Sequence, residues 1–269
     1  MQTDLFALAK ETRRDIVKMV ATAKSGHPGG SLSLVELLSV LYFEEMQIDP
    51  QNPRDPKRDR FILSKGHATP VYYATLSARG YFPKAELMTF RQINGRLQGH
   101  PDMNKTPGVD FTSGSLGQGL SIAVGMALAA RMDHSSSRIY AAMGDGEQQE
   151  GQIWEAAMAA GHYKLANLTA ILDNNELQIT GKVCDVMSVY PLKEKWQAFG
   201  WNVVEINGHD FDDIRRGFAA ARQETDKPTL ILAHTVKGKG ISFMENKASW
   251  HGTAPNAEQL AQALAELAV

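Results

Sequence analysis

The sequence predicts an α/β protein built on a parallel sheet that is flanked by helices on both faces. Strand-length apolar segments alternate with helix-length segments along the chain, the order that is typical of such folds. The strands are continuous apolar runs, as in residues 139–143, which is expected when a parallel strand is buried on both sides. The 269 residues are 43% hydrophobic, enough for a substantial core, and show no repeat or flexible linker. We therefore expect a single domain over residues 1–269.

Individual elements follow from periodicity and from start and stop signals. Apolar positions at helical spacing predict a helix from about Leu5 to Ala23, ended by a lysine and a glycine. A second helix is expected from Ser33 to Met46, with Ser33 as its N-cap and Glu36 as the capping-box partner. The further elements expected are strands at 60–63, 138–143, 168–172, 201–206 and 229–234, and helices at 68–79, 113–132, 152–165, 212–222 and 256–268.

Charge and cysteine content argue against several classes of function. The net charge is −2 and no polybasic cluster occurs, so we expect binding neither to nucleic acid nor to a membrane surface. No apolar run approaches the ~18 residues that a bilayer span needs, and the first residues lack a signal-peptide pattern. The single cysteine, Cys184, excludes an internal disulfide and is either inert packing or a nucleophile. These features predict a soluble, cytoplasmic protein.

Two side chains whose oxygen atoms can bind a metal ion are expected at the ends of neighbouring strands. Asp145 follows the strand at 138–143, and Asn175 follows the strand at 168–172, with one helix between the strands. The carboxyl ends of parallel strands meet at one edge of the sheet, where α/β proteins bind ligands. A carboxylate and an amide oxygen suit Mg²⁺, which commonly completes its shell with phosphate oxygens and water. Gly146 lets a phosphate approach the backbone closely. Either half alone could be an ordinary tight turn, but the pairing favours a metal–diphosphate site.

Four of the eight histidines lie in loops rich in glycine or proline. They are His27, His67, His100 and His251. Each one alone is most simply a hydrogen-bonded surface or core residue. Together, on separate loops of one α/β sheet, they indicate a site where imidazoles donate, accept and transfer protons near neutral pH.

The segment from Gly144 to Ala157 resembles the thiamine diphosphate motif of transketolases. It reads Gly-Asp-Gly-Glu-x-x-Glu-Gly-x-x-Trp-Glu-Ala-Ala, and an Asp-x-Asn sequence that ends at Asn175 follows it. Ser-Gly-His-Pro-Gly, Ser-Lys-Gly-His-Ala, Gly-His-Pro and Trp-His-Gly occur in the same order as in that family. The resemblance covers essentially the whole chain but only the first half of a conventional transketolase. It implies the fold of the thiamine diphosphate-binding (PP) domain.

The resemblance also implies a set of cofactor contacts. A divalent cation, Mg²⁺ or a substitute such as Ca²⁺ or Mn²⁺, would be held by Asp145, Asn175 and the backbone carbonyl of Leu177. The implied contacts to thiamine diphosphate are His67 at the diphosphate, Gly114, Ser115 and Leu116 at the aminopyrimidine ring, and Gly144, Asp145, Gly146, Glu147 and Asn175 at the metal–diphosphate end. His27, His100 and His251 would be the catalytic residues that line the sugar site. Many family members have proline at the position of Ser115.

Two further pairs of residues each have two interpretations. Glu150 is either a solvated carboxylate at a helix start or, as the resemblance implies, part of a carboxylate network at a subunit interface. Glu155, on the same helix, would belong to that network. Lys237 and Lys239 either guide a phosphorylated substrate or lie in a mobile, solvated loop.

The expected activity needs a second chain. Thiamine diphosphate works through a carbanion on its thiazolium ring, and in this superfamily a second domain supplies the glutamate that assists its formation. The sequence has no second strand–helix series that could form this domain. We therefore expect the partner to be a C-terminal transketolase subunit, most simply in an α2β2 heterotetramer. The pair would transfer a two-carbon ketol unit from a ketose to an aldose, with sugar phosphates, a branched sugar phosphate or a sulfonated sugar as substrates.

Two alternatives stay open at this point. The α subunit of a 2-oxoacid dehydrogenase first component shares the metal motif and the division into two chains, but it does not match the histidine motifs. A non-catalytic subunit that holds the cofactor without turnover is the alternative of another class.

Overall fold

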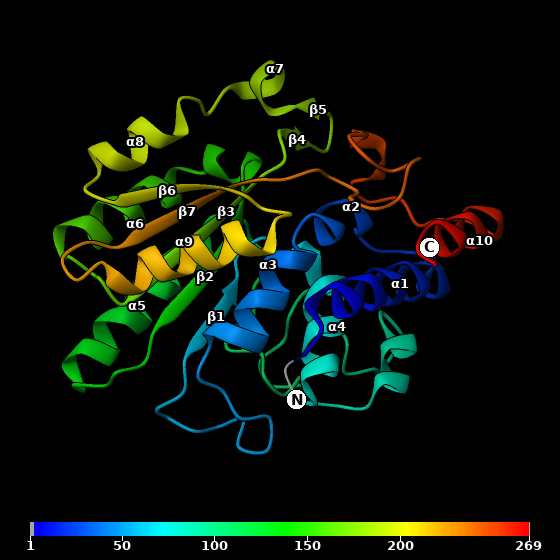
Figure 1. Ribbon diagram of the computed structural model, residues 1–269, viewed down its shortest axis with the longest axis horizontal. Helices are drawn as coiled ribbons and strands as arrows, with labels where there is room; N and C mark the ends of the chain where they lie inside the picture. Colours follow the sequence, from blue (N-terminus) through cyan, green and yellow to red (C-terminus); the bar gives the residue numbers. More distant parts are fainter. Residues whose placement is uncertain (1–2, 269) are drawn as a thin grey trace.

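The computed structural model describes residues 3–268 and contains a five-stranded, all-parallel sheet (Figure 1). The strands in spatial order are β1 (Arg60–Leu63), β2 (Ile139–Gly144), β3 (Leu168–Asn174), β7 (Thr229–His234) and β6 (Asn202–Asn207). A short antiparallel pair, β4 (Leu177–Gln178) and β5 (Gly181–Lys182), follows β3. The predicted fold class is confirmed, and each predicted strand lies within two residues of its expected bounds.

Helices cover both faces of the sheet, and alternate residues of each strand point to opposite faces. In β2, Tyr140 and Ala142 belong to one apolar cluster, whereas Ile139, Ala141 and Met143 belong to the other. The first cluster contains residues of α1 (Leu5–Ala23), α3 (Val35–Val40), α4 (Thr69–Arg79), α9 (Phe211–Gln223) and α10 (Ala257–Glu266). The second contains residues of α5 (Gln118–Met132), α6 (Gly151–His162) and α8 (Leu192–Ala198).

Short elements connect these layers. They are α2 (Pro28–Leu32), the π-helical turn η1 (Leu41–Glu45), the 3-10 turns η2 (Gly66–Ala68), η3 (Lys84–Thr89), η4 (Gly146–Gln149) and η5 (Ala248–Trp250), and α7 (Val183–Met187). Within residues 3–268, no helix combines the length and the apolar character that crossing a bilayer requires. The predicted cytoplasmic location stays a prediction.

The helix expected from Ser33 to Met46 begins at Val35 and continues from Leu41 as the π-helical turn η1, and its predicted capping box is wrong. A turn at Ser33 separates α2 from α3, and α3 has no side-chain cap. The hydroxyl of Ser33 donates to Asp173 Oδ2 at 2.6 Å, and Glu36 accepts hydrogen bonds from Arg13. Both side chains therefore bind distant partners, which satisfy them better than the local backbone does.

The helix expected from Ser113 begins later, at Gln118. Gly117 has a left-handed φ of 84°, so the chain before it is not helical. The carboxylate of Glu147 accepts from the N–H of Gly117 at 2.8 Å and fixes this start. The non-helical segment before Gln118 is thereby left free to line the site described below.

Close packing between α6 and the chain after α8 depends on Gly161. A Cβ atom at Gly161 would overlap with the carbonyl oxygen of Phe199, which is backbone and cannot rotate away. Gly125 in α5 offers a contrast, because a Cβ there would meet no atom within 4 Å.

We expect Gly161→Ala to lower the free energy of unfolding by about 1–3 kcal/mol, because the added methyl group overpacks a rigid contact. The control, Gly125→Ala, should be neutral or stabilising by up to about 1 kcal/mol, since alanine favours helix more than glycine does. Urea unfolding followed by circular dichroism measures both variants. Equal effects of the two substitutions would contradict this account of the packing.

Candidate active site

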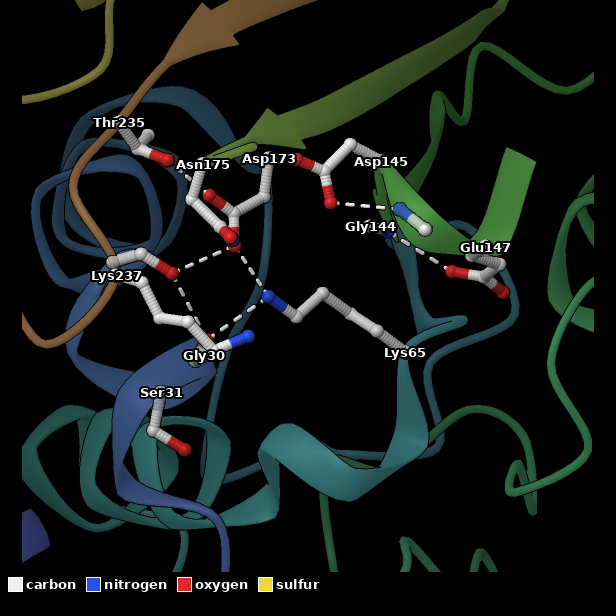
Figure 2. Close-up of polar contacts among 12 residues, drawn as sticks. Gly30, Ser31, Lys65, Gly144, Asp145, Glu147, Asp173, Asn175, Thr235 and Lys237 are labelled. Carbon is white, nitrogen blue, oxygen red and sulfur yellow. Dashed lines mark hydrogen bonds and ion pairs between the residues drawn. The ribbon is translucent and has the colours of Figure 1, made fainter. Parts of the chain in front are cut away.

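The site lies at the carboxyl edge of the sheet, where β2 and β3 end side by side. Gly144 pairs with Asp173 in the parallel register, so Asp145 and Asn175 follow neighbouring strand tips. The side chain of Asp145 reaches across to the loop after β3, where Oδ2 accepts from the N–H of Glu176. Its other oxygen accepts from the N–H of Gly146 at 2.7 Å. The two halves of the predicted signature therefore converge at one edge (Figure 2).

Asn175 and Leu177 complete a set of three oxygen atoms with Asp145. Oδ1 of Asn175 accepts from the N–H of Leu177 at 3.2 Å, and its amide group donates to Asp173 Oδ2 at 3.1 Å. The carbonyl oxygen of Leu177 accepts from Lys237 Nζ at 2.8 Å. Carbonyl and carboxylate oxygens have more than one lone pair, so each of these atoms can still offer one to a cation.

Asp173 is the buried centre of the site. Its carboxylate is fully buried and accepts from the ammonium of Lys65, the hydroxyls of Ser33 and Thr235, and the amide of Asn175 (Figure 2). Burial alone would raise its pKa, but the charge and hydrogen bond of Lys65 hold the pKa of Asp173 below its usual value. These donors come from four separate segments, and Asp173 therefore joins them at the end of β3.

The pKa of Asp145 is shifted in the opposite direction to that of Asp173. Burial and the nearby charge of Asp173 raise the pKa of Asp145 to about 6. Its two backbone hydrogen bonds and the more distant Lys237 do not offset these effects. Among residues 3–268 no side chain forms an ion pair with Asp145, and a buried carboxylate of this kind, next to amide and carbonyl oxygens, has the ligand chemistry of a Mg²⁺ site. The residues present therefore fit the divalent cation that the resemblance implies.

A cavity of about 310 Å³ adjoins these groups. Of the residues expected from the sequence, it is lined by His27, His67, Gly114, Leu116, Gly144, Asp145, Gly146, Glu147, Glu150, Asn175, Leu177 and His251. His100, Ser115 and Glu155 are not among its lining residues. His100 lies beside the lining, since a Cβ at Gly114 would be 3.5 Å from its ring. Glu155 is exposed on α6.

Three imidazoles meet at this cavity. The ring centroid of His251 lies 5.0 Å from that of His67 and 5.4 Å from that of His27. Burial, together with nearby positive charges, lowers the pKa of His27 to about 4 and that of His251 to about 3. Burial and Lys65 hold the pKa of His67 well below its usual range. In this arrangement the three rings are neutral at pH 7, so they act as hydrogen-bond donors and acceptors and not as imidazolium ions.

Lys65 is a site residue that the sequence analysis missed, and Lys237 is one for which it left two interpretations open. Lys65 is 2% exposed and sits beside Gly30, where a Cβ would lie 3.2 Å from Nζ of Lys65 and 3.7 Å from Nε2 of His67. Gly30 therefore keeps open the space between a buried ammonium and an imidazole, which fits a ligand with a negatively charged group such as a diphosphate. The Ser-Lys-Gly-His sequence was the available signal for Lys65.

The solvated-loop interpretation is wrong for Lys237. Its side chain is 2% exposed, and its ammonium donates to Leu177 O and lies 3.0 Å from Nδ1 of His251. Burial and the neighbouring Lys65 lower the pKa of Lys237 to about 8. Lys239, in contrast, is partly exposed and lies 3.5 Å from a carboxylate oxygen of Glu245.

Glu147 fastens the segment before α5 to the strand tip. Its buried carboxylate accepts from Ser64 Oγ at 2.5 Å, from Gly117 N at 2.8 Å and from Gly144 N at 3.0 Å. Its burial raises its pKa. Glu147 thus connects β1, β2 and the 114–117 segment, which places Gly114 and Leu116 at the cavity.

A larger cavity of about 680 Å³ lies around the start of β1, but no histidine is among its lining residues, and the carboxylate among them is that of Asp110. Arg58 and Arg60 line it, and both are already bound to Asp110. We therefore assign the candidate active site to the cavity at the carboxyl edge, where the oxygen donors, lysines and histidines meet.

The fold and the site together define the class of protein, an α/β protein with a polar ligand site at the carboxyl edge of a parallel sheet. The family model described as the transketolase thiamine diphosphate binding domain matches residues 7–268. The chain therefore belongs to the family of transketolase thiamine diphosphate-binding domains. This match confirms the family and the cofactor that the sequence motifs imply.

Relatives of similar length are named as transketolase subunits. An apulose-4-phosphate transketolase subunit from Phocaeicola vulgatus is 46% identical over 99% of this chain and 95% of its own length. The 6-deoxy-6-sulfo-D-fructose transketolase subunit SqwG of a Clostridium species is 47% identical over 99% of this chain and 97% of its own length. The solved transketolase from Leishmania mexicana superposes with a TM-score of 0.94 at 32% identity. It covers 100% of this chain, which spans 42% of that longer protein.

We expect Lys65→Met to lower the free energy of unfolding by about 3–5 kcal/mol, because Asp173 would become a buried charge without its cation. The double variant Lys65→Met/Asp173→Asn should lose less than Lys65→Met alone, since it removes the orphaned charge. Urea unfolding of the wild-type chain, both single variants and the double variant gives the coupling energy. Additive effects of the two substitutions would show that the pair is not coupled as described.

Proposed function

We propose that this chain is the thiamine diphosphate-binding subunit of a two-chain transketolase. With a C-terminal partner subunit that supplies the pyrimidine-binding domain, it would move a two-carbon ketol unit from a ketose to an aldose. The observation that carries the proposal is the match, over nearly their whole lengths, to two relatives named as transketolase subunits. We further propose that residues 1–269 act as one cofactor-binding domain.

The polar groups at the strand tips would hold the cofactor. Asp145, Asn175 and the carbonyl of Leu177 would bind the divalent cation, Mg²⁺ or a substitute. Support comes from the raised pKa of Asp145 and from the convergence of these oxygen donors at one edge. Lys65 and His67 would face the diphosphate across the space that Gly30 leaves open. Bound thiamine diphosphate supplies a stabilised carbanion, the chemistry needed to break a carbon–carbon bond next to a carbonyl.

The histidines would bind the sugar. His27 and His251 line the cavity, and His100 lies next to Gly114 beside it. Neutral imidazoles can donate to a carbonyl oxygen and accept from a hydroxyl, so they suit an uncharged, oxygen-rich chain of carbon atoms. The 114–116 segment would face the aminopyrimidine ring. The negatively charged end of a phosphorylated or sulfonated sugar would be recognised mainly by the partner.

The subunit interface is proposed to include Glu150 and Glu155. Glu150 lines the cavity at the start of α6, and Glu155 is exposed on the same helix. Two carboxylates, one at the cavity and one on an exposed face of the same helix, suit a network between two active sites. An α2β2 heterotetramer is the simplest assembly that gives two such sites.

The relatives also bear on the alternatives. Those named above are transketolase subunits, and none is a 2-oxoacid dehydrogenase. The cavity keeps the cation donors and three of the four motif histidines, which argues against a subunit that has lost its catalytic groups. Both alternatives make different predictions in the assay that follows.

Reconstitution tests the function. The chain, expressed together with a C-terminal transketolase subunit that carries the pyrimidine-binding domain, should transfer ketol units between a ketose and an aldose in the presence of thiamine diphosphate and Mg²⁺. Either chain alone should give no more than a trace of this rate, because the site is divided between them. Phosphorylated and sulfonated ketoses are assayed in parallel, and the mass of the complex is measured by light scattering. Full transfer by this chain alone, or decarboxylation of a 2-oxoacid by the pair, would sink the proposal.

Asp145→Ala tests the cation site. In the reconstituted complex it should weaken Mg²⁺-dependent binding of thiamine diphosphate by more than about 100-fold, since it removes the charged ligand outright. Titration calorimetry measures binding, and circular dichroism checks that the fold persists. The control is Asp226→Asn, an exposed carboxylate paired with Lys164 before β7, which should bind the cofactor normally. Unchanged Mg²⁺ dependence in Asp145→Ala would remove this residue from the metal site.

A further inference from the structure

Lys237 and His251 share a contact that the roles proposed above do not use. Nζ of Lys237 lies 3.0 Å from Nδ1 of His251 and 2.8 Å from the carbonyl oxygen of Leu177. An ammonium group carries three donors and no acceptor. Nδ1 of His251 must therefore offer its lone pair to Lys237, and the proton of the neutral ring is left on Nε2.

Lys237 is held firmly enough to direct its neighbour. Its carbonyl oxygen accepts from the N–H of Asn246 at 2.9 Å, and the next N–H, of Gly238, donates to Gly29 O at 3.0 Å. Its side chain passes over Gly29, where a Cβ would lie 3.1 Å from Cγ of Lys237 and 2.8 Å from Trp250 O. Glycine at position 29 therefore allows the lysine to reach the histidine.

The other ring nitrogen of His251 is available to a ligand. Within residues 3–268, Nε2 makes no hydrogen bond, and the ring lines the cavity beside those of His67 and His27. A protonated Nε2 is a hydrogen-bond donor to oxygen. The opposite tautomer would present a lone pair there and would repel an oxygen atom that carries negative charge.

We propose that Lys237 is a positioning residue that holds His251 as the Nε2-protonated tautomer, so that His251 donates a hydrogen bond to a carbonyl or hydroxyl oxygen of the sugar. The sugar part of this inference rests on the proposed function, whereas the tautomer does not. A donor that is fixed before binding stabilises charge on an oxygen without reorganisation during the reaction.

His209 provides an internal control, because its contacts fix the opposite tautomer. Nε2 of His209 accepts from the N–H of Val236 at 2.8 Å, so its proton lies on Nδ1, which is 3.0 Å from Glu36 Oε2. Neither contact involves the side chain of Lys237. A change of residue 237 that leaves the fold intact should therefore leave His209 unchanged.

The test is nitrogen NMR of the ¹⁵N-histidine-labelled chain at pH 7, with His251→Gln and His209→Gln used to assign the two rings. We expect the Nε2-protonated pattern for His251 and the Nδ1-protonated pattern for His209. In Lys237→Met, the signals of His251 should move toward the averaged pattern of a ring that exchanges between tautomers. Those of His209 should stay in place.

Two results would overturn the proposal. One is Nδ1 protonation of His251 in the wild-type chain. The other is an unchanged His251 pattern in a folded Lys237→Met variant. If that variant unfolds, the His209 pattern is lost, and the wild-type spectrum alone then decides the tautomer.

Activity of the reconstituted pair gives the second measurement. At saturating thiamine diphosphate, Lys237→Met should lower kcat/KM by about 10–100-fold, by analogy with the loss of a residue that orients a metal-binding histidine. Full activity in a variant with the altered NMR pattern would overturn the positioning role and leave the proposed function standing. A wild-type pair without ketol transfer would refute the proposed function, while the spectra would still decide the tautomer.

Discussion

The buried ion pair between Lys65 and Asp173 is the interaction on which the site depends. Asp173 stands at the end of the central strand β3 and also binds Ser33, Thr235 and the amide of Asn175. Taking two charges out of water is costly, and such a pair is tolerable only when every remaining lone pair is satisfied. Here the four donors come from the loops after β1, β3 and β7 and from the turn before α3. All of these groups belong to this chain, so the ion pair and its further donors are formed by residues of one chain.

Glycine decides how closely these loops approach one another. In the Ser-Gly-His-Pro-Gly-Gly segment, Gly29 lets the stem of Lys237 pass, and Gly30 borders the ammonium of Lys65. Two buried lysines thus lie against neighbouring glycines of the short helix α2. The histidine of this segment lines the cavity, whereas its two final glycines leave room for the side chains of the two lysines. The motif therefore supplies a histidine and also two glycines that leave room for lysine side chains to pack against the backbone.

The strands and the pairing of Asp145 with Asn175 could be predicted because they depend on local pattern. Apolar runs fix the strands, and a polar residue just after such a run must lie at the carboxyl edge. The partners of Asp173 could not be predicted, because Ser33 and Lys65 meet it only through the folded sheet. The same limit explains the wrong capping box. Ser33 and Glu36 have the spacing of a helix cap, but stronger partners at distant positions take both side chains. Burial of Lys237 was equally hidden, since a basic residue that precedes a glycine also fits an exposed loop.

Two carboxylates at neighbouring strand tips, Asp145 and Asp173, show how one edge can serve two purposes. Both are buried, yet the pKa of Asp173 is lowered and that of Asp145 is raised to about 6. The difference follows from Lys65, which forms an ion pair with Asp173 and leaves Asp145 facing a second negative charge. An internal ammonium therefore satisfies one carboxylate permanently and makes the other favourable for an external cation. A cation that bound Asp145 would relieve the repulsion that burial intensifies, and it would do so at the point where Asn175 and Leu177 already present oxygen atoms. The proposed binding of a metal–diphosphate ligand at this edge would thus depend on an ion pair whose two residues are not among the proposed metal ligands.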